Sequence, residues 1–503
     1  MTVILRADAA EDIGTGHVMR CMGLAMRLEQ LGEQPIFVSR RNFPSLVERI
    51  EAAGWRHEAL PAASGDNSDR ATSVPHAHWL KGPWEADANA TANIAKETGA
   101  NWIVVDHYGL DIAWDNAVRA YGLKVAVLDD LADRKHAADL IADPSLNAEP
   151  HERYQSLIPR NCQKLFGPRY AILRPEFSET ERTPPVSGGP RCLIAFGGVD
   201  AAGMTLRAME AVAVARTRLF EVRVIVGGQN QSLDAIRGRA RTLGWPVHVD
   251  SNHMAAHMAH ADFAVGAGGH MLWERCAMAL PSVVAIVAPN QVEQVTVAAK
   301  TGACLALDAE TMSEEDLIRA IERLANHPDV RAEMGERARR AVDGLGGVRI
   351  ARRLADLGVR VRQATNADMA PMLEWRNDER IRRFSRDSAV IDPESHAAWF
   401  ARVLADEDRD LLVAEDDAGP LGVARFDRAG DAAEVSIYLT PDRLGSGLGA
   451  NLLLAGEDWL IEHAPSVRRI VAEVLDGNAA SEELFLSCGY VRTDGPFEKV
   501  LDR

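Results

Sequence analysis

The stretch ADAAEDIGTGHVMR, Ala7 to Arg20, follows a short apolar segment, TVILR (residues 2–6), and leads into VMRCMGLAMRLEQLG (residues 18–32). The apolar residues of the latter recur at helical spacing, and Gly32 fits the end of that helix. A strand, a glycine loop and a helix in this order present free backbone N–H groups to an anion, usually a phosphate. The sequence therefore predicts an anion-binding turn at the start of an α/β domain, with His17 beside the anion.

The position of His17 suits a general base. Gly14 and Gly16 allow a tight turn and a close approach of the backbone to a ligand. His17 falls at the first or second helical position, where the positive end of the helix disfavours an imidazolium ion. We expect a neutral imidazole that can accept a proton at pH 7. A glycine turn with a purely structural histidine fits the same short pattern.

The alternation of strand and helix continues in two blocks. The first contains TVILR, QPIFVS, WIVVD, KVAVLDD and LIADPS, and the second contains RCLIAFGG, EVRVIVGG, PVHVD, ADFAVGAGG and PSVVAIV. Residues 147–190, polar and proline-rich, are expected to be an interdomain linker, and residues 313–357 are expected to be helical. This rhythm is typical of parallel sheets covered by helices. We expect two Rossmann-like domains, residues 1–165 and 185–355, with ligand at the carboxyl ends of the strands.

A unit of different character begins near Val359. The segments LLVAED, GPLGVARFD and AAEVSIYLT predict an antiparallel meander, which precedes a glycine turn and a helix. Residues 359–503 are one domain in length. The expected fold class is therefore α/β throughout, with two Rossmann-like domains followed by a third, smaller α/β domain.

Composition excludes several classes of function. The net charge of −17 argues against a nucleic-acid partner and against docking on an anionic membrane. No apolar run is long enough for a membrane span and no signal peptide is recognisable, so no membrane insertion is expected. Six cysteines occur without a CxxC pair, which predicts neither a zinc knuckle nor a disulfide framework and favours the cytoplasm. The oligomeric state is not indicated.

The segment HMAAHMAHAD presents three histidines on one helix face. His253, His257 and His260 are spaced i, i+4 and i+7, a geometry that can hold a metal ion. No acidic residue is arranged as in an HExxH motif, and the segment precedes an apolar strand where a connecting helix is expected. We therefore predict an ordinary connecting helix and no metal site.

Five separated blocks resemble one family. LRADAAEDIGTGHVMRCMGLA, the stretch from VVDHYGLDIAWDNAVRAYG to LIAD, AFGGVD, ADFAVGAGGHMLWERCAMALP and PNQ occur in the order found in the UDP-sugar hydrolases of pseudaminic acid biosynthesis (PseG). The resemblance covers residues 1 to about 352. It implies a MurG-like pair of Rossmann domains in the GT-B arrangement. It also implies hydrolysis of the bond between UDP and a 2,4-diacetamido-2,4,6-trideoxy-altrose, with His17 as the catalytic residue.

The same resemblance assigns further residues. Asp8 is a candidate to orient His17 or a simple turn residue, and Tyr108 either faces the cleft or packs as an ordinary aromatic. Glu274 matches the glutamate that receives ribose hydroxyls. The other residues expected to bind the UDP-sugar lie in glycine loops and in the PNQ segment: Gly14, Gly16, Gly197, Gly198, Gly268, Gly269, Asn290 and Gln291.

The third unit resembles the GNAT acetyltransferases. IYLTPDRLGSGLGANLLLAGEDWL and DGNAASEELFLSCGY carry the resemblance, and WRND with HAAWF places it near the 4-amino-sugar acetyltransferases of the same pathway (PseH). The resemblance implies acetyl-CoA as co-substrate and no metal. Its expected binding residues are Leu439, Gly445, Gly447, Gly449 and Asn478.

Two residues depart from the acetyltransferase pattern. Leu444 stands where many members have Gln or Arg, although Arg443 is adjacent. Phe485 replaces a tyrosine that often protonates the departing thiolate, and a phenyl ring has no proton to donate. Water or Tyr490 is left as a substitute acid, unless the activity is slow or lost. Glu434 is a candidate base for the acceptor amine or a solvated edge residue.

The two resemblances predict a bifunctional enzyme that acetylates a UDP-4-amino sugar and then releases UDP from the product. UDP-amino-sugar substrates are the expected partners. One alternative is a MurG-like glycosyltransferase with an appended acetyltransferase. Another is a hydrolase whose GNAT half is a non-catalytic coenzyme-binding module. The stereochemistry of the sugar remains open, because a related amino sugar needs similar phosphate and uridine contacts.

Overall fold

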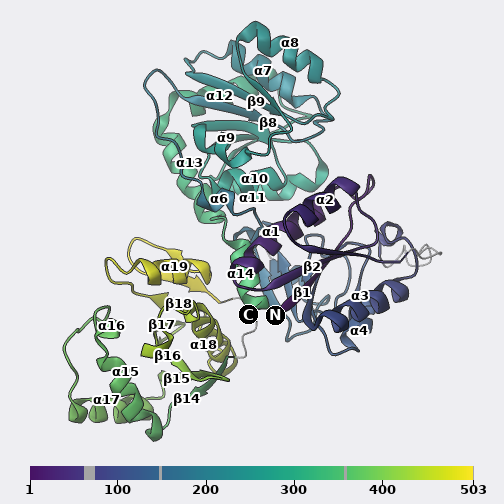
Figure 1. Cartoon of the computed structure of the whole chain (residues 1–503). Helices are drawn as coiled ribbons and strands as arrows, with labels where there is room; N and C mark the ends of the chain where they lie inside the picture. The colour runs from purple at the N-terminus through teal and green to yellow at the C-terminus, as the bar shows by residue number, and fades with distance from the viewer. Residues whose placement is uncertain (62–73, 147–149, 356–358, 502–503) are drawn as a thin grey trace. The chain divides into compact units, whose positions relative to one another are not determined.

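The computed structural model describes residues 1–61, 74–146, 150–355 and 359–501, and the side chains of residues 150, 151 and 290 are left undescribed. The chain forms two compact units, Met1–Ile350 and Ala351–Arg503. The first contains two parallel sheets, and the second contains a mostly antiparallel one (Figure 1). We call the part built on the first sheet the N-terminal lobe and the part built on the second the C-terminal lobe.

The N-terminal lobe is a seven-stranded parallel sheet in the order β3-β2-β1-β4-β5-β6-β7. Its strands are β1 (Thr2–Ala7), β2 (Gln34–Ser39), β3 (Arg56–Ala59), β4 (Ala100–Asp106), β5 (Lys124–Leu128), β6 (Leu140–Asp143) and β7 (Gln163–Phe166). Its helices are α1 (Gly16–Gln30), α2 (Pro44–Ala52), α3 (Trp84–Thr98), α4 (Ile112–Arg119) and α5 (Pro150–Tyr154), with the 3₁₀ turns η2 (Ala77–Trp79) and η3 (Pro168–Tyr170).

The C-terminal lobe is a six-stranded parallel sheet in the order β10-β9-β8-β11-β12-β13. Its strands are β8 (Arg191–Ala195), β9 (Glu221–Val226), β10 (Val247–Val249), β11 (Phe263–Ala267), β12 (Ser282–Ile286) and β13 (Leu305–Asp308). Its helices are α6 (Glu176–Glu179), α7 (Met204–Val214), α8 (Leu233–Leu243), α9 (Met254–His260), α10 (His270–Ala277), α11 (Val292–Lys300), α12 (Glu314–Asn326) and α13 (Pro328–Ala341), with η4 at Pro289–Gln291.

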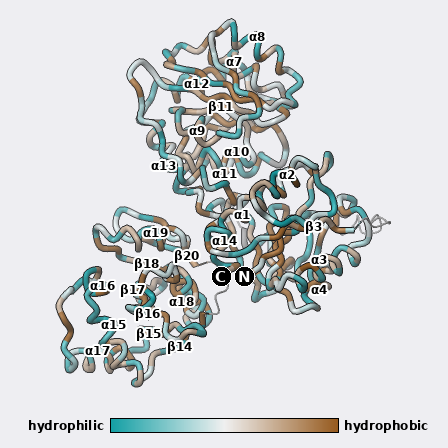
Figure 2. The backbone as a smooth tube through the Cα atoms, in the orientation of Figure 1, coloured by the Kyte–Doolittle hydropathy of each residue, from teal (hydrophilic) through white to brown (hydrophobic). Residues whose placement is uncertain are grey.

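Each parallel sheet is buried on both faces, as its near-continuous apolar strands require. In the C-terminal lobe one apolar core lies between the sheet and α7, α8 and α12, and a second lies between the sheet and α9, α10 and α11. Figure 2 shows the apolar strands enclosed by more polar helices. The strand order reverses beside β1 and β4 in one sheet and beside β8 and β11 in the other. Ligands of open α/β sheets bind at such points, beyond the carboxyl ends of the strands.

The expected linker is shorter than residues 147–190. The segment QKLF within it forms β7, which pairs in parallel with β6. Four residues give too little periodicity to separate an edge strand from a loop, which is why the sequence did not indicate it. Residues 313–357 contain α12, α13 and α14 (Gly346–Leu354), as expected.

The second unit is a seven-stranded sheet in the order β14-β15-β16-β17-β18-β20-β19. The predicted meander is present as β14 (Arg360–Gln363), β15 (Arg409–Asp416), β16 (Gly419–Ala429) and β17 (Ala432–Leu439), followed by β18 (Arg469–Ala472), β19 (Val491–Arg492) and β20 (Phe497–Val500). Its helices are α15 (Met369–Asn377), α16 (Glu379–Arg382), α17 (Pro393–Ala405), α18 (Gly449–His463) and α19 (Ala479–Ser487), with η5 (Asn366–Asp368) and η6 (Pro441–Arg443). No helix in the described parts of the chain is long and apolar enough to cross a membrane.

A buried ion network joins β1 to α3 in the N-terminal lobe. Asp87 on α3 accepts hydrogen bonds from Arg6 (Nη2, 2.8 Å), Arg40 (Nε, 3.0 Å) and the indole of Trp114 (3.0 Å). Asp87 and Arg6 are both fully buried. Breaking a buried ion pair from one side leaves an uncompensated charge in the interior, which is more costly than losing the pair as a whole.

We therefore expect Asp87→Asn to destabilise the first unit by about 3–5 kcal/mol. For a unit of this size that corresponds to a fall in the melting temperature of roughly 4–7 °C. Differential scanning calorimetry of the full chain measures it. Glu85→Gln, an exposed change on the same helix, is the control and should leave the transition in place. Equal melting temperatures for both variants would contradict the role assigned to Asp87.

Candidate functional site

His17 lies at the point where the strand order of the first sheet reverses. It is the second residue of α1, which follows β1, and it is 6% exposed. Its Nδ1 atom lies 2.6 Å from Oδ1 of Asp106, the last residue of β4. The two residues are 89 positions apart, and the parallel pairing of β1 with β4 brings them together.

The carboxylate of Asp106 fixes the tautomer of His17. Burial opposes ionisation of Asp106, but the charge of Arg20 and hydrogen bonds from Arg20 and His17 hold its pKa well below the usual range. An ionised carboxylate only accepts hydrogen bonds, so Nδ1 of His17 carries the proton. In the neutral imidazole the lone pair is therefore on Nε2, the nitrogen from which a general base would act.

Arg20 and Tyr108 extend this arrangement to a second carboxylate. Arg20 donates from Nε to Asp106 Oδ2 (2.7 Å) and from Nη2 to Asp106 Oδ1 (2.5 Å), and its Nη1 lies 3.4 Å from Asp130 Oδ2. The hydroxyl of Tyr108 donates to Asp130. Burial and the charge of Asp130 raise the pKa of Tyr108 well above its ordinary value, so this hydroxyl remains a donor.

Aromatic rings enclose the imidazole of His17. The edge of Tyr108 meets it at 4.5 Å between centroids, and Trp79 lies at 5.8 Å. Trp79 stacks on Tyr108 at 5.5 Å, and His76 lies 4.6 Å from Trp79. Tyr108 thus lies at the site, where its ring packs against His17 and its hydroxyl is bound to Asp130. His76 and Trp79 could not be predicted as site residues, because their segment, HAHW, has no recognisable motif.

Asp8 has a different role from the one expected. It does not hold His17: its carboxylate is engaged by Arg6 (Nη1, 2.6 Å) and by the backbone N–H of Arg40 (2.8 Å), and His107 Nε2 lies 3.3 Å away. Arg6 and Asp8 are two positions apart at the end of a strand, so they lie on the same side of it. Asp106 takes the orienting role. An acidic residue at the end of WIVVD was a signal that could have identified it.

Gly14 and Gly16 form an open turn in front of this site. Gly14 has a φ of +79°, which favours glycine, and a Cβ at either position would meet no other atom within 4 Å. Thr15, at the N-cap of α1, makes no side-chain cap. The turn therefore leaves space above the start of α1.

In the C-terminal lobe, the strand order reverses beside β11, and the helix that follows β11 also begins without a side-chain cap. Gly268 and Gly269 follow β11, and Gly269 is the N-cap of α10 with a φ of +75° and no side-chain cap. Gln291 lies against both glycines: a Cβ on Gly268 would come within 2.9 Å of its Oε1 atom. The structure thus brings Gly268, Gly269 and Gln291 together. Asn290 shares the turn Pro289–Gln291, and its side chain lies outside the described residues.

The loop that contains Gly197 and Gly198 is built differently. Gly197 has a φ of +90°. Gly198 and Gly227 lie in close contact, since a Cβ on Gly227 would overlap the carbonyl oxygen of Gly198. Asp200 accepts from the N–H groups of Met204 (2.9 Å) and Thr205 (2.8 Å). These first-turn donors of α7 are therefore already occupied. The start of α7 is thus closed by Asp200, unlike the open start of α1.

Glu274 lies on α10, one turn beyond the two glycines. Burial raises its pKa to about 7, against an opposing effect of Arg174 and Arg275. The pKa of His270, the first residue of α10, is lowered, first because the surrounding protein desolvates its ring and then because of the positive charges of Arg20 and Arg174. The negative charge of Asp130 acts in the opposite direction. Arg20 and Asp130 belong to the N-terminal lobe, so the open start of α10 lies within electrostatic range of the His17 site.

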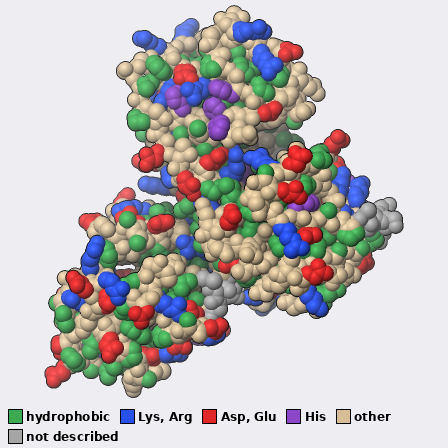
Figure 3. Space-filling model, in the orientation of Figure 1, with side chains coloured by type: hydrophobic (Ala, Val, Ile, Leu, Met, Phe, Trp, Pro, Cys, Tyr) green, Lys and Arg blue, Asp and Glu red, His purple; other side chains and the backbone are tan. Residues whose placement is uncertain are grey.

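The three histidines of HMAAHMAHAD lie where a connecting helix was expected. Figure 3 shows histidine side chains gathered on one face of the C-terminal lobe, and α9 joins β10 to β11 there. His257 Nε2 lies 3.0 Å from Ser251 Oγ, and His260 Nε2 lies 3.0 Å from Glu221. His253 precedes the helix. Across the described parts of the chain, no group of three or more His, Cys, Asp or Glu side chains has a metal-binding arrangement.

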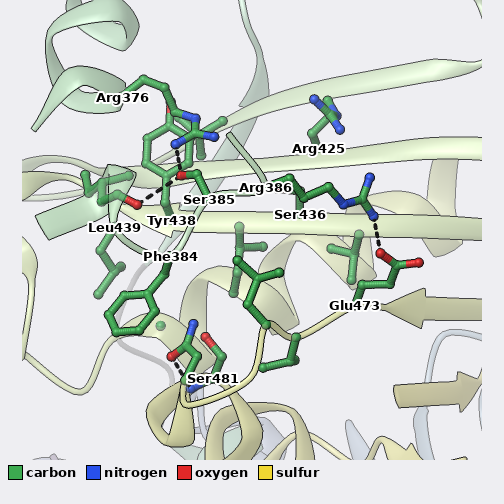
Figure 4. Close-up of a pocket in the computed structure, with 18 of the residues that line it drawn as sticks. Arg376, Phe384, Ser385, Arg386, Arg425, Ser436, Tyr438, Leu439, Glu473 and Ser481 are labelled. Carbon is green, nitrogen blue, oxygen red and sulfur yellow. Dashed lines mark hydrogen bonds and ion pairs between the residues drawn. The ribbon is translucent and has the colours of Figure 1, made fainter. Parts of the chain in front are cut away.

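The second unit contains a cavity of about 920 Å³. It lies where β17 and β18 part: their parallel pairing ends at Glu434 and Val471, while β17 continues beside β16 to Leu439. Beyond Glu434 the strand therefore presents backbone groups toward the cavity. Figure 4 shows Tyr438, Leu439 and Ser436 of β17 along one wall, opposite Phe384 and Ser481.

Four of the residues expected to bind acetyl-CoA line this cavity: Leu439, Gly445, Gly449 and Asn478. Gly445 and Gly447 each have a φ of +78° and open space around them, which suits a turn that approaches a ligand closely. Gly449 is required for packing as well, because a Cβ there would come within 2.5 Å of Leu484. Asn478 caps α19 by accepting from the N–H of Ser481 (3.2 Å).

Phe485 lines the cavity, but Tyr490 does not replace the missing hydroxyl. Tyr490 is completely buried in the core behind Phe485, with 4.9 Å between the ring centroids. It is therefore no candidate acid. Tyr438 does line the cavity, and burial raises its pKa well above the ordinary value, so its hydroxyl stays protonated.

The charged residues of the cavity are paired in unexpected ways. Glu434, the candidate base, binds Arg386. Arg386 also contacts Glu473 at 2.7 Å, as Figure 4 shows. Arg443, adjacent to Leu444, pairs with Asp416 (2.6 Å) and so is held at the side of the turn. Arg386 binds Oε1 of Glu434, and a proton from an amine would have to reach the carboxylate beside this ion pair.

The raised pKa of Glu274 gives a stability prediction. A carboxyl whose folded-state pKa lies near 7, above the unfolded value near 4.5, lowers stability progressively as the pH rises through that interval. Above pH 7 the cost is at most about 3 kcal/mol. Glu274→Gln should therefore melt at a higher temperature than the wild type at pH 8 and at a nearly equal temperature at pH 4.5. The exposed Glu336→Gln is the control. A gain that does not depend on pH would contradict the raised pKa.

Comparisons with known proteins fit this division of the chain. Residues 359–491 match the acetyltransferase (GNAT) domain, and residues 193–345 match the glycosyltransferase family 28 C-terminal domain. The first unit shares its fold with MurG of Acinetobacter baumannii, with a TM-score of 0.50 at 12% identity, over 70% of this chain and 99% of that one.

Three curated relatives are similar in sequence. An uncharacterized protein of Methanocaldococcus jannaschii is 20% identical across 98% of this chain and 97% of its own length. The spore coat polysaccharide biosynthesis protein SpsG of Bacillus subtilis is 30% identical over 39% of this chain and 59% of its own length. The UDP-2,4-diacetamido-2,4,6-trideoxy-beta-L-altropyranose hydrolase of Campylobacter jejuni is 23% identical over 35% of this chain and 53% of its own length. The chain therefore combines MurG-like Rossmann lobes, the second of glycosyltransferase family 28 type, with a GNAT acetyltransferase domain, and part of it is homologous to a UDP-sugar hydrolase.

Proposed function

We propose that the first unit hydrolyses the glycosyl–phosphate bond of UDP-2,4-diacetamido-2,4,6-trideoxy-β-L-altropyranose. We propose further that the second unit forms this substrate by acetylating the 4-amino precursor with acetyl-CoA, and that both reactions occur in the cytoplasm. The observation that carries the hydrolase proposal is the hydrogen bond between His17 Nδ1 and the buried carboxylate of Asp106, beside the open glycine turn that precedes α1.

In the proposed reaction, Nε2 of His17 accepts a proton from a water molecule as that water attacks the anomeric carbon. A bond forms between the carbon and the water oxygen, and the bond from the carbon to the phosphate oxygen breaks. The electron pair leaves with UDP, and the configuration at the anomeric carbon inverts. UDP is a good leaving group, so the reaction does not need a strong general acid. Asp106 stabilises the imidazolium that forms on His17.

The departing diphosphate gains negative charge and needs donors. The uncapped first turn of α10 offers backbone N–H groups at the positive end of a helix, and Gly268 and Gly269 let phosphate oxygens approach them. Glu274, one turn further, suits the ribose hydroxyls. Gly197, Gly198, Gln291 and Asn290 complete the proposed nucleotide and sugar contacts, with Gly14 and Gly16 on the other side of the site.

The cavity of the second unit fits acetyl-CoA, which would supply the acetyl group. Gly445 and Gly447 form the turn before α18 that would receive the pyrophosphate, and α18 has no side-chain cap. The free edge of β17 from Val435 to Leu439 would hold the extended arm by backbone hydrogen bonds. Glu434 and Tyr438, at opposite ends of that edge, are candidates to move protons.

A mass-spectrometric time course tests both activities at once. Purified full-length protein receives UDP-4-amino-4,6-dideoxy-N-acetyl-altrosamine with and without acetyl-CoA. We expect UDP only when acetyl-CoA is present, with an acetylated UDP-sugar that rises and falls before it. Loss of UDP from supplied diacetamido substrate without any acetylation would contradict the acetyltransferase part alone. Failure of both reactions would contradict the proposal.

Substitution of the dyad should remove hydrolysis and leave binding. We expect His17→Gln and Asp106→Asn to lower kcat by roughly 10²- to 10⁴-fold, with little change in KM, because they remove the proton acceptor or its orientation. The rate of UDP release measures this. His253→Gln, in the C-terminal lobe, is the control and should retain the wild-type rate. A main effect on KM would instead make His17 a binding residue.

The match to glycosyltransferase family 28 favours a second candidate, transfer of the sugar to an acceptor hydroxyl. His17 could deprotonate a hydroxyl as well as water. The two reactions differ in product, since hydrolysis in ¹⁸O-labelled water places the label on the released sugar. Unlabelled sugar joined to an added acceptor would favour the transferase.

Phe485 gives a prediction for the acetyltransferase. It is 5% exposed and lines the cavity, so Phe485→Tyr adds a hydroxyl near the reacting groups with little change in packing. If the wild type lacks an acid there, we expect the acetylation rate to rise by about tenfold or more. Tyr438→Phe should lower the wild-type rate if Tyr438 already serves. A wild type that acetylates rapidly would exclude a non-catalytic GNAT module.

A further inference from the structure

We infer that Arg20 is a positioning residue that sets the proton affinity of His17 by binding the carboxylate that holds it. The inference rests on the proposed function only in taking His17 as the general base. Arg20 lies one helical turn after His17 on α1, so the two side chains leave the same face of the helix and both reach Asp106.

All three guanidinium nitrogens of Arg20 are directed at carboxylates. Nε and Nη2 bind the two oxygens of Asp106 at 2.7 and 2.5 Å, and Nη1 lies 3.4 Å from Asp130. The side chain of Arg20 is only 11% exposed, and Asp106 is fully buried. A bidentate contact of this kind is rigid as well as strong. The guanidinium group of Arg20 is thus occupied by the carboxylates beside His17 and is not exposed as a ligand for phosphate.

The charge of Arg20 opposes the effect of Asp106 on the imidazole. A carboxylate alone in contact with a histidine favours the imidazolium ion and raises the histidine pKa by about 1–3 units. An imidazolium has no lone pair with which to accept a proton from water. Arg20 shares both oxygens of Asp106 and adds a positive charge beside the ring. It therefore opposes the rise that Asp106 alone would cause, while Asp106 still orients the ring.

Other titratable groups near His17 do not replace this effect. Tyr108 stays protonated, and Asp130 is countered by Arg20 and by the Tyr108 hydroxyl. His76, on the segment before η2, has its pKa lowered, first by burial. From the C-terminal lobe, His270 also has a lowered pKa. Among the described groups around His17, Arg20 is the cation that contacts Asp106.

The test is a titration of His17 in the full chain. Histidine labelled with ¹³C at Cε1 gives one signal for each residue, and the signal absent from His17→Gln is assigned to His17. We expect Arg20→Gln to raise the His17 pKa by about one unit or more. Arg20→Lys should give a smaller rise, because it keeps the charge but loses the bidentate contact. Asp130→Asn removes a negative charge and should shift the pKa in the opposite direction.

Arg27→Gln is the matched control. Arg27 is a buried arginine on the same helix, two turns away, and it binds Glu179 (2.9 Å) and Ser178 (2.7 Å) at a distance from the His17 site. It should leave the His17 titration unchanged. A His17 pKa that stays at the wild-type value in both Arg20→Gln and Asp130→Asn would overturn the inference, as would an equal shift in Arg27→Gln.

Kinetics separate this inference from the proposed function. In Arg20→Gln, the acidic limb of the pH profile of kcat/KM for UDP release should move to higher pH by the same amount as the titration. A rise in KM with an unmoved limb would overturn the inference and make Arg20 a substrate ligand. If no UDP-sugar is hydrolysed by the wild type but the titration shifts as expected, the proposed reaction fails and the role of Arg20 stands.

Discussion

The N-terminal lobe depends on carboxylates buried at the carboxyl ends of its parallel strands. Four adjacent strands, β1, β4, β5 and β6, each end at or one residue before an aspartate that is at most 1% exposed: Asp8, Asp106, Asp129 and Asp143. Charges cannot lie so deep without partners. Each aspartate accordingly has an arginine within 3.0 Å: Arg6, Arg20, Arg134 and Arg153 respectively. This row of ion pairs holds the loops that carry the site.

In the C-terminal lobe, the groups available to bind an anion are backbone N–H groups. Its strand ends carry glycines, and the start of α10 is left uncapped, whereas α7 is closed by Asp200. In the proposed reaction, the N-terminal lobe would supply a fixed base and the C-terminal lobe would supply open N–H groups. The division is physically reasonable, since a base must be held in one orientation and a diphosphate is best received by several donors at once.

The sequence predicted the architecture well because its signals are local. Apolar segments of regular spacing indicated both parallel sheets and the antiparallel meander, and the glycine turns at Gly14 and Gly445 lie where expected. The strand β7 was missed because four residues carry almost no periodicity. The site was only half predicted. His17 stood out by its motif, but its partner Asp106 lies 89 residues away and is brought near only by the pairing of β1 with β4. Asp8, nearer in sequence, was misassigned because its strand directs it to Arg6.

The separation of β17 from β18 after Glu434 has a consequence for the stability of the second unit. It leaves an edge inside the sheet, where residues 435–439 of β17 have no paired strand on the β18 side within the described part of the chain. Any molecule that completes this edge binds the native state and not the unfolded chain, so it stabilises the domain in proportion to the logarithm of its concentration. Under the proposed function that molecule is acetyl-CoA, whose supply would then set the lifetime of the domain against proteolysis.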